Sequence, residues 1–360
     1  MGQQLPAPDS PPSAPYDVLV TGSSGHLGTA LMLRLPDLGF RPLGIDILPS
    51  SCPVVRSRAG DTLTGSISDR DFVRDILAAN PQIRHIVHAA TLHKPHVASH
   101  PAQAFIDANL TGTLTLLEAA ADILVPGGQF ASFVFISTTS TFGAALSPLP
   151  GLPAAWIDES VTPKPKNIYG VTKCAAEDLC YLAHKANPSL PVLVLRTSRF
   201  FPEEDDDEER RSAMAEDNLK VLELTYRRCD IHDVVSACRS AMNAAKDIGW
   251  GKYIISAPPP FRRDDETLTA LNAGRSAGVL ERVAPGVGDV FRARGWKFLP
   301  CIDRVYDSSR AVAELGWTPE YTFERTVERV KKGEEWRSPL ALQVGRKGYH
   351  AVSTGVYTKR

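Results

Sequence analysis

A regular alternation of short apolar runs and longer amphipathic segments is the feature that most constrains this fold. Runs rich in Val, Ile, Leu and Phe predict strands, and the segments between them have helical spacing. Apolar runs separated by helices, with few hairpin signals, favour βαβ units and an α/β fold with a doubly wound parallel sheet buried on both faces. The expected strands cover residues 17–21, 41–46, 84–88, 131–137, 191–197 and 252–257, and the expected helices cover 26–35, 69–79, 102–122, 167–186 and 231–246.

Two stretches interrupt this regularity and predict a smaller C-terminal lobe. Residues 201–228 are charged and then helical, and the region from 258 follows a triple-proline stop. Both follow expected strands, so we place them over the carboxyl ends of the sheet. The division expected is a proline-rich disordered tail at 1–15, a main domain of 16–200 and 229–257, a lobe of 201–228 and 258–340, and a tail at 341–360.

The composition favours a globular protein that binds neither nucleic acid nor a membrane. The chain is 43% hydrophobic and 22% charged, and its net charge of -1 gives no general attraction to nucleic acid or anionic lipid. No apolar run approaches the roughly 20 residues of a membrane span. The N-terminus lacks the basic and apolar regions of a secretory signal. We therefore expect a cytoplasmic protein.

The cysteines and histidines do not predict a metal site. The six cysteines contain no Cys-x-x-Cys pair, which argues against zinc and against a disulfide framework. His93, His96 and His100 have spacings that suit a metal on a helix, but Pro95 intervenes and no acidic or cysteine ligand lies nearby. We expect no metal, and we expect His93 to line a cofactor or substrate cleft.

The stretch "VLVTGSSGHLGTALMLRL" (18–35) places three glycines, Gly22, Gly25 and Gly28, between an expected strand and helix. Such a turn lets the backbone approach a pyrophosphate, which the helix N-terminus then binds. Asp46 ends the next strand, where an acidic side chain accepts hydrogen bonds from ribose hydroxyls and repels a 2'-phosphate. The spacing favours NAD over NADP. A tight turn with a surface aspartate is the alternative.

Two further motifs carry proton chemistry. Tyr169 and Lys173 lie four residues apart, on one face of an expected helix, and an adjacent ammonium lowers the pKa of a phenol. Residues 137–141 form a hydroxyl cluster at a strand end, where a hydroxyl such as that of Thr138 can polarise a substrate oxygen. Taken singly, a solvated Tyr–Lys pair and a strand-capping turn are the alternatives.

The order of these motifs resembles the extended short-chain dehydrogenase/reductase family, of the NAD-dependent epimerase/dehydratase type. Between them stand His88-Ala-Ala and "NLTGT" from Asn109, and "LRTSRFFP" follows the Tyr-x-x-x-Lys pair. The resemblance runs from about Asp17 to Thr326. It implies a Rossmann domain that binds NAD and a C-terminal lobe that binds the substrate.

The resemblance also implies roles for single residues. Tyr169 would be the acid/base, Lys173 would hold the nicotinamide ribose and lower the pKa of the tyrosine, and Thr138 would polarise the substrate oxygen. The residues expected at the cofactor are Gly22, Gly25, His26, Leu27, Gly28, Asp46, Ser66, Ile67, Ala89, Ala90, His93, Asn109 and Ser137, together with Tyr169 and Lys173.

Two positions depart from the family pattern. Ser66 stands where the family often has an aspartate near the adenine, so adenine recognition is expected to use backbone groups. Arg199 stands where nucleotide-sugar enzymes carry an asparagine, which counts against a UDP-sugar substrate.

The substrate is expected to contact Thr139, Arg199, Phe200 and Phe201. The guanidinium of Arg199 could pair with a carboxylate or phosphate, unless the acidic run at 203–209 neutralises it. This acidic run is expected to be either a solvated surface segment or a contact for a cationic group of the substrate.

The expected activity is oxidation of a secondary hydroxyl of a sugar-like or other small polar substrate, with hydride transfer to NAD. Dehydrogenase and epimerase outcomes remain open, and a dehydratase ranks last because Thr139 and Ser140 are not acids. The main alternative is a catalytically silent NAD-binding sensor or scaffold. A homodimer through the helices at 102–122 and 167–186 is also expected from the resemblance.

Overall fold

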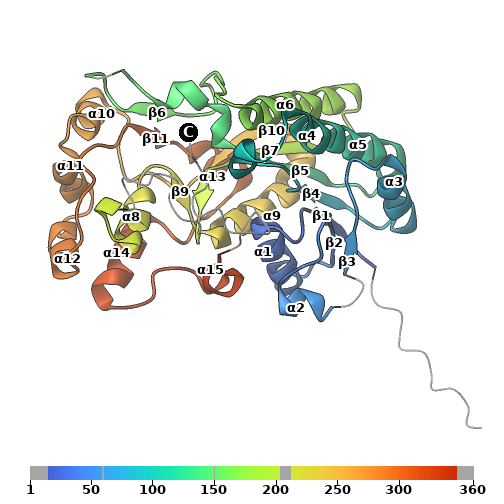
Figure 1. Cartoon of the computed structure of the whole chain (residues 1–360), viewed down its shortest axis with the longest axis horizontal. Helices are drawn as coiled ribbons and strands as arrows, with labels where there is room; N and C mark the ends of the chain where they lie inside the picture. Colours follow the sequence, from blue (N-terminus) through green and yellow to red (C-terminus); the bar gives the residue numbers. More distant parts are fainter. Residues whose placement is uncertain (1–14, 59–60, 150, 203–211, 347–360) are drawn as a thin grey trace, which may run out of the picture.

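The computed structural model describes residues 15–58, 61–149, 151–202 and 212–346. Its centre is a seven-stranded sheet whose neighbouring strands all run parallel, which confirms the predicted α/β fold (Figure 1). Most of the predicted N-terminal tail and the acidic run at 203–209 lie outside the described residues. In spatial order the strands are β10 (Trp250–Ile255), β7 (Val192–Thr197), β5 (Ser132–Thr138), β4 (His85–His88), β1 (Val18–Thr21), β2 (Pro42–Asp46) and β3 (Thr62–Thr64).

Helices cover both faces of this sheet, so the fold is doubly wound (Figure 1). In β1, Val18 and Val20 join the core beneath one helical layer, whereas Leu19 joins the core beneath the other. Successive strand residues point to opposite faces, so a strand that is apolar throughout needs cover on both. One layer contains α3 (Arg70–Ala79), α5 (Gly112–Ala119) and α6 (Ile168–Ala186), and the other contains α1 (His26–Arg34) and α9 (Ile231–Ile248).

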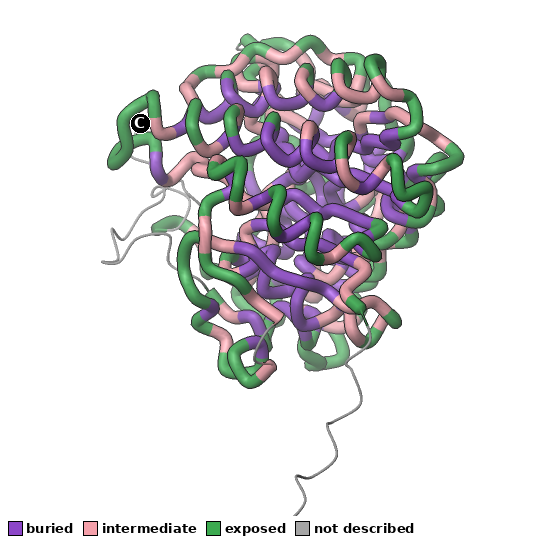
Figure 2. Tube along the Cα trace, turned by 90° about the vertical axis from the view of Figure 1, so that its right-hand side faces the viewer, coloured by how far each residue is buried: buried purple, intermediate pink, exposed green. Residues whose placement is uncertain are grey.

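The buried positions follow the central strands, and the exposed positions lie on the outer turns of the helices (Figure 2). The predicted helix at 102–122 is a continuous helical segment with two π-helical turns. Its parts are α4 (Ala102–Ile106), η3 (Asp107–Thr111), α5 and η4 (Ala120–Leu124). Short helical turns elsewhere are η1 (Pro36–Leu38), α2 (Pro53–Arg56), η2 (Lys94–Ala98), η5 (Thr139–Thr141) and η6 (Gly143–Leu146).

A lobe of short helices lies beside the carboxyl ends of the strands, on the left in Figure 1. Two small parallel sheets link it to the main domain. In one, β6 (Ala155–Ile157) pairs with β11 (Arg304–Tyr306), and in the other, β8 (Arg199–Phe200) pairs with β9 (Arg228–Cys229). The helices of the lobe are α8 (Glu216–Glu223), α10 (Asp265–Asn272), α11 (Ser276–Val283), α12 (Val287–Ala293) and α14 (Phe323–Lys332).

Two C-terminal helices differ from the expected division of the chain. α13 (Ser309–Leu315) packs on α9 and β10, and α15 (Pro339–Val344) packs on α1 and α9. Leu340, Ala341 and Val344 are buried there. This part of the chain therefore returns from the lobe to cover the main domain, instead of ending as a tail from residue 341. No helix within the described ranges is long and apolar enough to cross a membrane.

Two buried carboxylates tie the C-terminal segment to the start of α9. Asp233 accepts hydrogen bonds from the backbone N–H groups of Glu320 and Tyr321, at 2.8 and 2.9 Å. Asp230 caps α9 and accepts hydrogen bonds from the backbone N–H and the hydroxyl of Ser338, at 3.0 and 2.6 Å. Burial raises the pKa of Asp233 to about 7, against the two N–H bonds, which lower it. These bonds hold α14 and α15 in place.

The Asp233→Asn substitution should destabilise the protein at pH 8.5, where the carboxylate is ionised. An amide can accept only one of the two hydrogen bonds and turns its own N–H groups toward the other donor. A buried donor without an acceptor costs about 1–3 kcal/mol, which urea unfolding would measure. Asp247→Asn, at an exposed position on the same helix, is the control. Equal effects of the two substitutions would contradict the anchoring role.

Candidate active site

The glycine turn forms a tight corner between β1 and α1. Gly22 has a φ of +71°, and a Cβ there would lie 2.7 Å from the backbone N of Ala90. A Cβ at Gly28 would lie 1.9 Å from the Gly22 carbonyl oxygen. Gly25 is the N-cap of α1 and provides no side-chain cap. The first turn of α1 therefore presents backbone N–H groups and the positive end of the helix dipole to a phosphate.

Asp46, at the end of β2, faces this turn. Its Oδ2 accepts a hydrogen bond from the Ser24 backbone N–H at 3.0 Å, and its Oδ1 accepts one from the Leu48 N–H, also at 3.0 Å. Each carboxylate oxygen has a further lone pair for a ribose hydroxyl. The predicted pair of glycine turn and strand-end acid thus lies in one place and is linked by a hydrogen bond.

Thr138 and Tyr169 meet where β5 ends and α6 begins. Asn167 caps α6 by accepting a hydrogen bond from the Gly170 N–H at 2.9 Å, which places Tyr169 in the first turn. Burial raises the pKa of Tyr169 to about 12, and a hydrogen bond with Thr138 lowers it. Both side chains are less than a tenth exposed. The two side chains therefore adjoin each other at one buried place.

Lys173 lies one helical turn after Tyr169, and its ammonium points toward β5. Its Nζ donates a hydrogen bond to the Ile136 carbonyl at 2.7 Å and lies 4.0 Å from the centre of the Phe135 ring. Burial lowers the pKa of Lys173 to about 7, against the neighbouring Cys180 and Glu177, which raise it.

The expected effect of Lys173 on the pKa of Tyr169 is not found. Burial dominates the pKa of Tyr169, and the group that lowers it is Thr138. The physical reason is the direction of the Lys173 side chain, which ends at the Ile136 carbonyl. The protein alone therefore keeps the phenol neutral.

Asn109, in the π-helical turn η3, organises the loop that follows β4. Its Oδ1 accepts hydrogen bonds from the Leu92 N–H and the Thr91 hydroxyl, both at 2.8 Å. Its Nδ2 donates to the Leu92 carbonyl at 2.9 Å and to the Thr172 hydroxyl at 3.0 Å. These bonds join the loop to α6 and bring the His93 ring to 6.5 Å from the Tyr169 ring, centre to centre. Asn109 positions the site from within the protein.

Ser137 and Glu177 belong to a buried ionic cluster beside this site. The Ser137 hydroxyl donates to Glu177 Oε1 at 2.6 Å, so the side chain does not face a cofactor, contrary to the prediction. Glu177 also binds Arg196 of β7 and Lys252 of β10. Sequence reasoning missed Glu177 and Arg196, although the spacing of four residues from Lys173 to Glu177 was available as a signal.

Other predicted residues are divided between the cleft and the core. Phe201 is fully buried and packs edge-on against Trp336 at 5.0 Å, so it does not line a substrate surface, contrary to the prediction. The side chains of Leu27 and Ile67 are also buried, in the two cores of the main domain, so only their backbones can serve a cofactor. Phe201, Leu27 and Ile67 have large apolar side chains, and this explains why all three are buried in the core.

The remaining cofactor and substrate positions stay predictions. Ser66 is exposed, and its hydroxyl accepts a hydrogen bond from the Ser68 N–H at 3.2 Å. His26 lies 5.6 Å from the Phe200 ring, centre to centre, which joins the start of α1 to β8. Thr139 opens η5 directly after Thr138 and is buried. Ala89 and Ala90 pack against Gly22.

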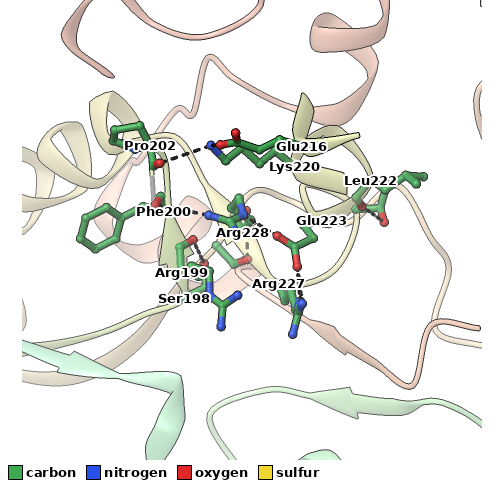
Figure 3. Close-up of polar contacts among 12 residues, drawn as sticks. Ser198, Arg199, Phe200, Pro202, Glu216, Lys220, Leu222, Glu223, Arg227 and Arg228 are labelled. Carbon is green, nitrogen blue, oxygen red and sulfur yellow. Dashed lines mark hydrogen bonds and ion pairs between the residues drawn. The ribbon is translucent and has the colours of Figure 1, made fainter. Parts of the chain in front are cut away.

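Arginines gather where β8 and β9 pair. Arg199 and Arg227 project on the same side of these strands in Figure 3. Glu223 accepts hydrogen bonds at 2.6 Å from both Arg227 and Arg228, and Arg228 and Glu223 are fully buried. Arg227 and Arg228 are thus both paired with Glu223.

Within the described residues, no group of three His, Cys, Asp or Glu side chains could hold a metal ion. Cys174, beside Lys173, has its pKa raised to about 11 by burial. All six cysteines are free thiols.

Lys173→Met should flatten the dependence of stability on pH. Because the folded-state pKa of Lys173 is lowered to about 7, the unfolded chain binds more protons between pH 7 and 10, and the free energy of unfolding rises over that range. Urea unfolding at several pH values should give a smaller rise in the variant. Lys185→Met, exposed on the same helix, is the control. Identical slopes for both variants would show that Lys173 is not a source of this dependence.

Residues 18–253 match the sequence model of a family described as the NAD dependent epimerase/dehydratase family. A UDP-glucose 4-epimerase of Yersinia pestis is 28% identical over 186 residues, which cover 50% of this chain and 52% of that relative. A dTDP-glucose 4,6-dehydratase of Xanthomonas campestris is 26% identical over 329 residues, 86% of this chain and 90% of the relative. The chain thus aligns with about half the length of several of the curated epimerases it matches.

Solved structures share the fold. A UDP-glucose 4-epimerase of Thermotoga maritima, solved with UDP-glucose, superposes with a TM-score of 0.57 at 20% identity, over 88% of this chain and 99% of that one. A UDP-glucuronic acid 4-epimerase of Bacillus cereus, solved in complex with NAD, has a TM-score of 0.57 at 20% identity, over 89% of this chain and 100% of that one.

Proposed function

The chain belongs to the NAD dependent epimerase/dehydratase family, and on that premise we propose that it oxidises a secondary hydroxyl of a sugar-like substrate with NAD as its cofactor. Tyr169, Lys173 and Thr138 are the residues proposed to handle the proton. The observation that carries this proposal is the buried hydroxyl pair of Thr138 and Tyr169 at the carboxyl end of β5. Such a pair can hold one substrate oxygen between two hydroxyl groups.

The residues around the glycine turn fit an NAD molecule. Gly22 and Gly28 leave no room for a side chain, the N-terminus of α1 offers N–H groups to a pyrophosphate, and Asp46 can accept hydrogen bonds from a ribose. The ammonium of Lys173 supplies donors for the second ribose. Bound NAD+ supplies a hydride acceptor and a positive charge near Tyr169.

The side chains divide the proton transfer between them. The Thr138 hydroxyl donates a hydrogen bond to the substrate oxygen and Tyr169 exchanges a proton with it. With its pKa raised to about 12, Tyr169 is held as the neutral phenol, the form that returns a proton to an alkoxide. Removing a proton from an alcohol needs the phenolate, whose formation a nearby positive charge favours.

The arginines at β8 and β9 support a substrate with an anionic group. Arg199 and Arg227 project on the same side of this strand pair (Figure 3). A guanidinium group binds a phosphate or carboxylate through two parallel hydrogen bonds. The relatives are named for UDP-glucose and dTDP-glucose, and both sugar nucleotides carry such groups. A nucleotide sugar or a sugar acid is therefore the substrate class proposed, and the names of the relatives here outweigh the expectation against UDP-sugars drawn from Arg199.

Tyr169→Phe should slow turnover strongly and leave NAD binding largely intact. Protein purified under native conditions would be denatured, and the released small molecules measured by mass spectrometry for NAD and NADH. The native protein would then be incubated with UDP-glucose, dTDP-glucose and UDP-glucuronate. We expect a turnover about 10²–10⁴ times slower in the variant, the usual cost of losing an acid/base group.

Tyr181→Phe, exposed on the same helix, is the control for this measurement. Equal turnover by Tyr169→Phe and native protein would exclude the proposed acid/base. Native protein that binds NAD and converts none of the three substrates would favour the silent sensor or scaffold.

We also propose that two copies pair through α4, α5 and α6, which lie side by side (Figure 1). These helices expose apolar side chains to solvent, among them Val171, which is 49% exposed, and Leu182, which is 63% exposed. Ile106 and Leu114, each 37% exposed, extend the surface. Apolar helix faces of this kind are buried when identical copies associate about a twofold axis.

Leu182→Glu should convert the dimer to a monomer, because it places a charge within the apolar contact. Light scattering should give twice the chain mass for the native protein and the chain mass for the variant. Leu152→Glu, 51% exposed on a loop outside these helices, should remain dimeric. A monomeric native protein would refute the pairing.

A further inference from the structure

Three successive residues of β5 adjoin three residues of α6 that are spaced one helical turn apart. The Ile136 carbonyl accepts a hydrogen bond from Lys173 at 2.7 Å, and the Ser137 hydroxyl donates to Glu177 at 2.6 Å. Thr138 lies close enough to Tyr169 to lower the pKa of its phenol. We propose that Glu177 is a positioning residue that holds α6 in register with β5 and sustains the positive charge of Lys173. This inference rests on the proposed function of Lys173.

Glu177 is the most firmly held of the three helix residues. Its side chain is 1% exposed and accepts hydrogen bonds from Arg196 Nε at 3.0 Å and Arg196 Nη2 at 2.7 Å. The ammonium of Lys252 donates to the same carboxylate at 3.1 Å. Burial raises the pKa of Glu177, but the hydrogen bonds and charge of Arg196 outweigh that effect and leave it below its usual value. The carboxylate is therefore ionised inside the protein.

The partners of Glu177 lie on three adjacent strands. Ser137 is in β5, Arg196 in β7 and Lys252 in β10, and these strands pair side by side. A rotation or slip of α6 would break the contacts of Glu177 with all three. Because Lys173 and Tyr169 share a helix face with Glu177, the same contacts fix where their side chains reach β5.

Cys180 and Glu177 both raise the pKa of Lys173, and Glu177 is the one of the two that is ionised near pH 7. The ionisable groups that interact with this ammonium are Glu177 and Cys180 on α6 and His88 on β4. Burial raises the pKa of the Cys180 thiol and lowers that of His88, so both are neutral near pH 7. Tyr169 is neutral as well. Asp178 and Cys174 lie beside Glu177 on α6, and the positive groups facing it are Arg196 and Lys252.

The test is Glu177→Gln, made in the native chain and in the Lys173→Met background. Without the carboxylate, the pKa of Lys173 should fall further, so the rise of unfolding free energy with pH should begin below pH 7. In the Lys173→Met background, Glu177→Gln should not move this rise between pH 6 and 10. A purely structural role of Glu177 would lower stability equally at each pH and in both backgrounds, which would overturn the proposal.

A second readout is the affinity for NADH, measured by fluorescence at pH 8. Glu177→Gln should weaken NADH binding about tenfold, because Lys173 loses charge and alignment. Asp178→Asn removes a carboxylate at the adjacent, exposed position and should leave the affinity unchanged. Equal affinities of the native protein and Glu177→Gln would refute the positioning role. Native protein that does not bind NADH would refute the proposed function, whereas the pH measurement would still test the link from Glu177 to Lys173.

Ser137→Ala covers the case in which Glu177→Gln fails to fold. It removes the bond from β5 to Glu177 and leaves the ion pairs with Arg196 and Lys252 in place. We expect a several-fold weaker NADH affinity with folding retained. Unchanged affinity in this variant would count against the proposal.

Discussion

Burial of a parallel sheet on both faces is the constraint on which the rest of this structure depends. A polar side chain within such a sheet has no access to water and must find a partner inside the protein. His88 in β4 is held between the Thr21 and Thr113 hydroxyls, at 2.7 and 2.9 Å, and burial keeps its pKa well below the usual value. The same demand gives Ser137 its bond to Glu177. The candidate site is therefore bounded by groups whose partners are already assigned, which limits the side chains that can face a ligand.

Strands and helices with a clear hydrophobic periodicity could be predicted from the sequence, whereas strands of only three residues could not. The six expected strands and five helices carry long apolar patterns, and all are present within about two residues of the expected ends. β3 was missed because two of its three residues are threonines and it lies at the sheet edge. β6 and β11 have three residues each and pair across about 150 positions of sequence, so neither carries a local signal of its partner.

Positions in the candidate site could be predicted where the residue type itself determines the chemistry. They were harder to predict where the role depends on the direction in which a side chain points. Gly22 and Asp46 lie together because the first two strands of a βαβ unit pair side by side, which follows from the motif. The direction of Lys173 toward the Ile136 carbonyl does not follow from its spacing to Tyr169, since both β5 and the cleft adjoin that helix face. Phe201 is itself a predicted substrate contact, yet its ring fills the core instead.

Charged side chains lie on two sides of the candidate site, whereas its centre carries little charge. Tyr169 and His88 are neutral, and the pKa of Lys173 is near 7, so the centre carries little charge before a ligand is present. Formal charges stand further out, with Glu177 and Arg196 between α6 and β7 and the arginines at β8 and β9 toward the lobe. A site of this kind avoids the cost of burying an unpaired charge and leaves Lys173 sensitive to small changes in its surroundings. Under the proposed function, changes near Glu177 should act on proton transfer, and changes at Arg199 should act on the choice of substrate.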